Sequence, residues 1–166
     1  MALAQGVNSY VTLEEANLYM VDRIDVTPWE VAANEDRAKA LVTENNLIDL
    51  KYFIGTTTSE SQPLAWPRSG VQYADARSNR IITVGDNIIP SGIKKATYEL
   101  ALHLLANEEI LTSKEQTFER IKVGPIEIED SASDFQSVPV IPSLVNDILK
   151  PFIKFQPTAN TWWRAN

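Results

Sequence analysis

The strongest helix signal in the chain is residues 91–107, which read SGIKKATYELALHLLAN. Pro90 and Ser91 suit the start of a helix, and apolar residues then fill nearly every position from Leu100 to Ala106. A helix that is apolar almost all round is buried on most of its sides, either at the centre of a domain or between subunits. The sequence leaves these two positions open.

Two start signals precede this helix in the N-terminal part of the chain. Thr12-Leu13-Glu14-Glu15 has the form of a capping box, and apolar residues at helical spacing follow it. This pattern predicts a helix at about 12–24. Thr27-Pro28-Trp29-Glu30 repeats the signal, with a cap residue, proline at the first helical position and glutamate at the third. A second helical region is expected to begin there.

Two more helices follow from the same reasoning. Asn34 is a candidate N-cap, and the apolar stripe behind it predicts a helix over about 34–53, ended by Gly55. Pro142-Ser143 predicts the start of a last short helix, at about 143–150.

The remaining chain has no helical period. Residues 55–90 are rich in Thr, Pro and Gly and are predicted to form a long ordered loop. Alternating apolar residues around Gly124-Pro125 predict a β-hairpin at about 117–130. The expected fold is α+β, mainly α: a helical bundle core with this loop, the one hairpin and a C-terminal arm. Residues 1–150 would form the folded domain, hairpin included, and residues 151–166 the extended arm.

Composition limits the function classes. The chain has 166 residues, no cysteine and a formal net charge of −7, which excludes disulfides, thiolate catalysis and cysteine-bound zinc and disfavours non-specific duplex binding. Only residues 51–100 carry more bases than acids, six against four. No apolar run approaches the roughly 20 residues of a spanning helix. We expect no membrane contact, no secretory signal and synthesis in the cytosol.

The sequence offers little for catalysis. The one histidine, His103, lies within the most apolar helix and is best interpreted as a core or interface residue. There is no Walker loop, no dinucleotide fingerprint and no histidine pair with metal-ligand spacing. We therefore predict that the protein is not an enzyme and that it uses no cofactor and no metal.

The segment LAWPRSG, residues 64–70, has two interpretations. In the functional one, Trp66 and Arg68 stack on bases and neutralise phosphate, as in single-strand binders. In the structural one, which we favour, Trp66 fills the core, Pro67 fixes the turn and Arg68 pairs with an acid of the N-terminal third. The bases of the middle third remain candidates for facing DNA: Arg68, Arg77, Arg80, Lys94 and Lys95.

The C-terminal arm carries aromatic residues without a periodic pattern. Trp and Arg dominate hot spots of protein interfaces, so Trp162-Trp163-Arg164 suggests an anchor for another protein. The alternative is that the arm folds back on its own subunit. We expect the arm to be disordered in the free protein and to dock on assembly. The candidate contact residues are Phe152, Phe155, Trp162, Trp163 and Arg164.

Several segments in order resemble the small tailed-bacteriophage virion proteins that serve as head-to-tail adaptors, a set often labelled DnaT-like single-stranded DNA-binding protein. The match runs from about Asn8 to Phe155, and the residues after it lie outside the resemblance. It is carried by Asn8–Ala16, Leu64–Val71, Ile89–Leu105, Val123–Ile128 and Pro142–Ile153. Thr56-Thr57-Thr58 stands where that pattern is often basic, which weakens the DNA-binding label.

The resemblance implies a structural adaptor, one subunit of a ring of commonly twelve copies, which bridges the portal and the tail around the DNA exit channel. Its partners would be the portal protein, tail or nozzle proteins, other copies of itself and, weakly, the DNA in the channel. The arm would bind the portal or a neighbouring subunit, and the protein would reside in the virion neck after synthesis in the host cytoplasm. The alternatives are a DnaT-like single-stranded DNA-binding replication accessory, against which the net charge counts, and a non-viral interaction module.

Overall fold

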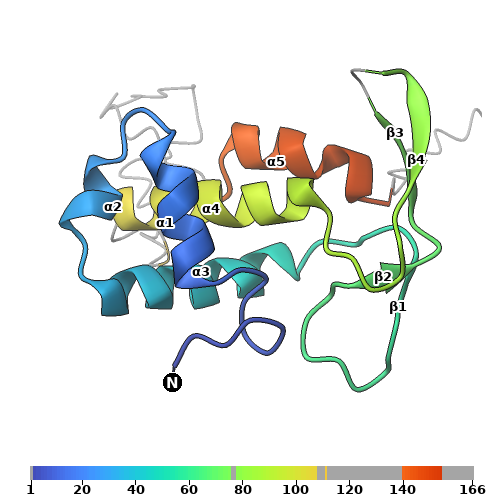
Figure 1. The fold of residues 1–166 in the computed structure, drawn as a ribbon, viewed down its shortest axis with the longest axis horizontal. Coiled ribbons are helices and arrows are strands. Elements are labelled where there is room, and N and C mark those ends of the chain that lie inside the picture. Colours follow the sequence, from blue (N-terminus) through green and yellow to red (C-terminus); the bar gives the residue numbers. More distant parts are fainter. Residues whose placement is uncertain (1, 76–77, 108–110, 112–139, 155–166) are drawn as a thin grey trace, which may run out of the picture.

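The computed structural model describes residues 2–75, 78–107, 111 and 140–154. Helices dominate these residues, and two small antiparallel sheets accompany them, so the fold is α+β and mainly α, as predicted (Figure 1). None of the helices within these ranges is long and apolar enough to cross a membrane. In chain order the elements are α1 (Leu13–Val21), α2 (Thr27–Val31), α3 (Asn34–Ile48), β1 (Thr56–Thr57), β2 (Arg68–Ser69), β3 (Gln72–Asp75), β4 (Arg80–Thr83), α4 (Ser91–Ala106), α5 (Ser143–Leu149) and the 3-10 helix η1 (Lys150–Phe152).

Helix α4 is the centre of the bundle, which is the first of the two positions that its composition allows. It packs most extensively on α3 and α5 and also contacts α1 and α2 (Figure 1). Ile93, Leu100 and Ala101 are completely buried. The predicted helices near 12–24, 34–53, 91–107 and 143–150 are all present.

The helix starts follow the sequence signals with one correction. The capping box of α1 is formed: the Glu15 backbone N–H donates to Thr12 Oγ1 and the Thr12 N–H donates to Glu15 Oε2, both at 3.1 Å. Asn34 is not the N-cap of α3, because Ala33 takes that position without a side-chain cap. The Asn34 amide oxygen instead accepts a hydrogen bond from Arg37 at 3.3 Å.

Helix α3 ends at Ile48, earlier than the predicted end near residue 53. The Asp49 carboxylate explains the difference, since it accepts hydrogen bonds from the Tyr10 hydroxyl and from the Ala65 N–H and so ties the helix end to two other segments. Gly55 does not cap the helix. It has a φ of +73°, and a Cβ there would lie 2.5 Å from the Ser69 carbonyl oxygen, so glycine is required for close approach to β2.

The segment predicted as a long ordered loop contains two small antiparallel sheets. β1 pairs with β2, and β3 pairs with β4 in the register Gln72–Thr83 to Asp75–Arg80. In the connecting turn the Ser78 N–H donates to the Asp75 carboxylate at 3.2 Å. The apolar residues of β4 were visible in the sequence, but the partner strand β3 has no clear alternation. The hairpin predicted at about 117–130 lies outside the described residues.

A carboxyl group is enclosed between α3 and α4. Glu44 is fully buried, and neither of its carboxyl oxygens has a hydrogen-bond partner in the described part of the chain. The Thr97 hydroxyl, on α4, and the Asn45 side chain lie next to this carboxyl group without a hydrogen bond of good geometry to it, and their proximity only partly offsets the effect of burial on its pKa. Burial raises the pKa of Glu44 well above its usual value, and the negative charge of Asp49 adds to the effect. The folded state therefore favours the protonated form of Glu44.

This raised pKa predicts a pH dependence of stability. The contribution of Glu44 is fully present below its unfolded pKa of about 4.3 and is lost as pH rises through its folded pKa. Glu44→Gln removes that loss. The free energy of unfolding of the variant, relative to wild type, should rise by about 1 kcal/mol or more between pH 4 and pH 8, measured by urea denaturation. A difference that stays constant over this range would show that Glu44 ionises normally in the fold.

Candidate nucleic-acid interface

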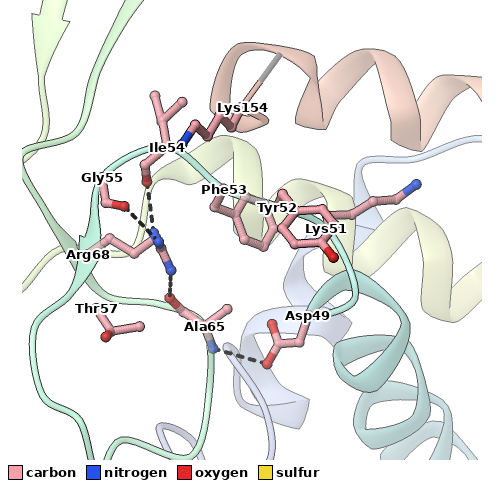
Figure 2. A pocket seen from close by; sticks show the side chains of 10 residues that line it. All are labelled: Asp49, Lys51, Tyr52, Phe53, Ile54, Gly55, Thr57, Ala65, Arg68 and Lys154. Carbon is pink, nitrogen blue, oxygen red and sulfur yellow. Dashed lines mark hydrogen bonds between the residues drawn. The ribbon is translucent and has the colours of Figure 1, made fainter. Parts of the chain in front are cut away.

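A cleft of about 510 Å³ lies beside the C-terminal end of α3, and three basic side chains line it (Figure 2). Lys51 and Tyr52 come from the segment after α3, Arg68 from β2 and Lys154 from the segment after η1. The Tyr52 side chain is 68% exposed, whereas its neighbour Phe53 is buried. The cleft therefore combines an open aromatic ring with positive charge.

A short backbone ladder builds this cleft from distant parts of the sequence. Phe53 pairs antiparallel with Ile153, the Ile54 N–H donates to the Phe152 carbonyl at 2.9 Å, and the Lys154 N–H donates to the Tyr52 carbonyl at 2.7 Å. These bonds hold Tyr52 and Lys154 side by side. The sequence does not identify Lys51, Tyr52 and Lys154 as site residues, because the pairing that joins their segments leaves no periodic signal.

Phe152 anchors the ladder in the core. Its ring meets the Trp66 ring edge-on at a centroid distance of 5.9 Å and lies 4.8 Å from the Tyr73 ring. A Cβ on Gly92, at the start of α4, would lie 2.5 Å from Phe152 Cε2, so the ring packs directly on that helix. The interpretation of Phe152 as a partner-binding residue is corrected, because the chain's own core buries it.

The LAWPRSG segment, residues 64–70, has a structural role in the described fold. Trp66 is 1% exposed and packs on Phe53 at a centroid distance of 5.5 Å, and its peptide bond to Pro67 is cis. Arg68 does not form an ion pair with an acid of the N-terminal third. Its guanidinium donates instead to the backbone carbonyls of Ile54, Ala65 and Gly55, at 2.8, 3.1 and 2.8 Å (Figure 2).

Three of the other bases expected to face DNA do not line this cleft: Arg80, Lys94 and Lys95. Lys94 forms an ion pair with Glu15 of α1 at 2.7 Å. Arg80 is exposed on β4, where it pairs in register with Asp75, and Lys95 is exposed on α4. Arg77, Phe155, Trp162, Trp163 and Arg164 lie outside the described residues.

The charges at the cleft favour an anionic ligand. Within the described ranges, Lys51 and Lys154 have no ion-pair partner. Asp49 is the one acid that lines the cleft, and its carboxylate is engaged by Tyr10 and Ala65. Burial raises the pKa of Asp49, which further reduces its tendency to carry charge. Across the described part of the chain, no group of three acids or histidines is placed to share a metal ion.

A substitution at Arg68 separates its structural role from a role of charge alone. Arg68→Lys keeps the positive charge but loses the planar guanidinium group, whose N–H groups donate to three backbone carbonyls. We expect the free energy of unfolding to fall by about 1–3 kcal/mol in chemical denaturation. Lys51→Arg is the matched control and should leave stability unchanged. An Arg68→Lys variant as stable as wild type would mean that the carbonyl bonds contribute nothing.

A family model matches residues 2–165, nearly the whole chain. No curated protein and no solved structure gives a significant match. The family match agrees with the label that the sequence resemblance carries. The chain belongs to the family described as "Putative DnaT-like ssDNA binding protein".

Proposed function

We propose that the protein binds single-stranded DNA and that the Tyr52 cleft is the contact site. The family description supports the ligand. The observation that carries the site is the exposed Tyr52 ring, which the backbone bond from Lys154 holds in the same cleft as three basic side chains. Single-strand binders combine these two features, because bases stack on aromatic rings while cations follow the phosphates.

The charge of the chain sets the strength of this binding. Residues 1–50 carry nine acids and three bases, so DNA is repelled from that part of the chain. Contact is therefore local, through Lys51, Arg68 and Lys154. Three neutralised phosphates give a slope of about −2 for log K against log salt on a single strand. Affinity is weak at physiological salt and rises steeply at low salt.

Substitution of Tyr52 tests the site. Tyr52→Ala should weaken binding of a labelled oligothymidine at low salt about tenfold, because stacking is worth about 1–3 kcal/mol per base. Tyr52→Phe keeps the ring and should bind as wild type does. Lys154→Ala should reduce the salt slope by about 0.7. Fluorescence anisotropy over a salt series measures all three.

The control is Lys39→Ala, which removes an exposed lysine paired with Asp36 on α3 and lying outside the cleft. It should change neither affinity nor slope. The proposal is wrong if Tyr52→Ala binds DNA as wild type does, or if Lys39→Ala reduces affinity as much as Lys154→Ala.

A second candidate function is supported by an exposed apolar surface. Leu18, Val21 and Ile24 are 66%, 80% and 87% exposed, and we call these three residues the α1 patch. An apolar surface of this kind is typical of a protein contact. Together with the resemblance to phage adaptors, it supports a non-catalytic ring subunit in the virion neck that bridges the portal and the tail. The portal, tail or nozzle proteins, further copies and the channel DNA would be its partners.

The C-terminal arm gives a test of this adaptor function. If the arm binds the portal or a neighbouring subunit, Trp162→Ala combined with Trp163→Ala should leave the melting temperature unchanged and prevent the joining of heads to tails. Electron microscopy of assembly products and protein analysis of purified virions measure the outcome. A variant that unfolds, or particles that assemble normally without the two tryptophans, would contradict the adaptor function of the arm.

A further inference from the structure

We infer that the α1 patch binds the Trp162-Trp163-Arg164 segment of a second copy of this chain. The inference deepens the adaptor candidate, since it rests on contact between copies, and it is independent of DNA binding. It names the two parts of the chain that would form that contact, the α1 patch and the Trp162-Trp163-Arg164 segment.

The α1 patch is the solvent side of an amphipathic helix. The opposite side of α1 buries Ala16 and Met20 in the core. Leu18 and Val21 are one helical turn apart and therefore share a face, and Ile24 follows just beyond the helix end. Nothing in the described part of the chain covers these three side chains, which are each at least 66% exposed.

The rim of the α1 patch is acidic. Glu14, Asp22 and Asp25 are exposed around it. The base Arg23 lies close to Asp25, but its guanidinium is bound to Glu99 of α4 at 2.9 Å and to the carbonyl of Ile24 at 2.6 Å, so its charge is already balanced by Glu99. Two such patches facing each other would bring like charges together, which disfavours a symmetric contact. The occupant must be apolar with a cationic neighbour.

The chain contains a segment of that chemistry. Residues 155–166 read FQPTANTWWRAN and include two adjacent tryptophans, one arginine and no acid. Two indole rings match the size of three aliphatic side chains, since each aromatic residue buries about 150–250 Å². Arg164 is the cation that the acidic rim requires. Trp and Arg are also the residues that most often dominate protein contacts.

The attachment point of the segment favours a second copy. Lys154 is bonded to Tyr52 and follows η1, which lies toward the β-strand end of the molecule, whereas α1 lies toward the α2 end (Figure 1). The chain between Lys154 and Trp162 spans at most about 28 Å when fully extended. To reach its own α1 patch the segment would have to run back over the helices toward the α2 end (Figure 1). A neighbouring copy offers its patch without that constraint, and the contact is then head-to-tail.

Disulfide trapping tests the contact directly, because the chain has no cysteine of its own. One preparation carries Val21→Cys, in the patch, and the other Ala165→Cys, beside the tryptophans. Mixed and oxidised, the two should give a disulfide-linked heterodimer. Adding Trp162→Ala and Trp163→Ala to the Ala165→Cys chain should reduce its yield at least fivefold. The matched control is Leu50→Cys in place of Val21→Cys, since Leu50 is 75% exposed but lies after α3.

The outcomes separate the possible occupants. A heterodimer that needs both Val21→Cys and the tryptophans supports the inference. An equal yield with Leu50→Cys overturns it. A chain that carries both cysteines and closes only within itself also overturns it, and assigns the α1 patch to its own C-terminal segment. Asp22→Arg should weaken trapping about fivefold, and Arg164→Asp in the other chain should restore it. Failure of this contact would leave joining of heads and tails through the portal untouched, so the two proposals fail separately.

Discussion

The burial of α4 is the constraint on which the rest of the structure depends. A helix apolar on nearly all sides must be covered by segments from both ends of the chain, and α1, α2, α3 and α5 supply that cover. The ring of Phe152 completes this cover of α4. It packs into the space where a Cβ of residue 92 would stand, which is free because that residue is Gly92. The 3-10 helix η1, which contains Phe152, is thereby held against the start of α4.

The candidate DNA site is a consequence of that closure. Once Phe152 is fixed, its carbonyl and the residue after it, Ile153, pair with the segment after α3, and Lys154 is bonded to Tyr52. Arg68 stabilises the other wall by binding three carbonyls, and its charge remains at the cleft. The site therefore requires no dedicated element, since packing of the helical core places its aromatic and basic groups together.

The sequence correctly predicted the elements that depend on interactions between neighbouring residues. The capping box at Thr12 and the apolar run of α4 depend on neighbouring residues, so their elements were found. The end of α3 was placed too late because Asp49 is tied to Tyr10 and Ala65, far away in the sequence. Tyr52 and Lys154 were missed, and Phe152 was misjudged, for the same reason. Each depends on a pairing between residues about a hundred positions apart.

The distribution of charge along the chain is compatible with both proposed contacts, the weak one with DNA and the one between copies of the chain. Among the acids of the N-terminal fifty residues, Glu14, Asp22 and Asp25 border the α1 patch, whereas the cleft bases belong to segments after α3. Exposed charges act mainly over short range, since those separated by more than about 8 Å are largely screened at physiological salt. If both proposals hold, the acidic surface would repel phosphate and keep a DNA strand at the cleft. The same acids would favour a cationic protein segment, so the protein contact and the nucleic-acid contact would use surfaces of opposite sign.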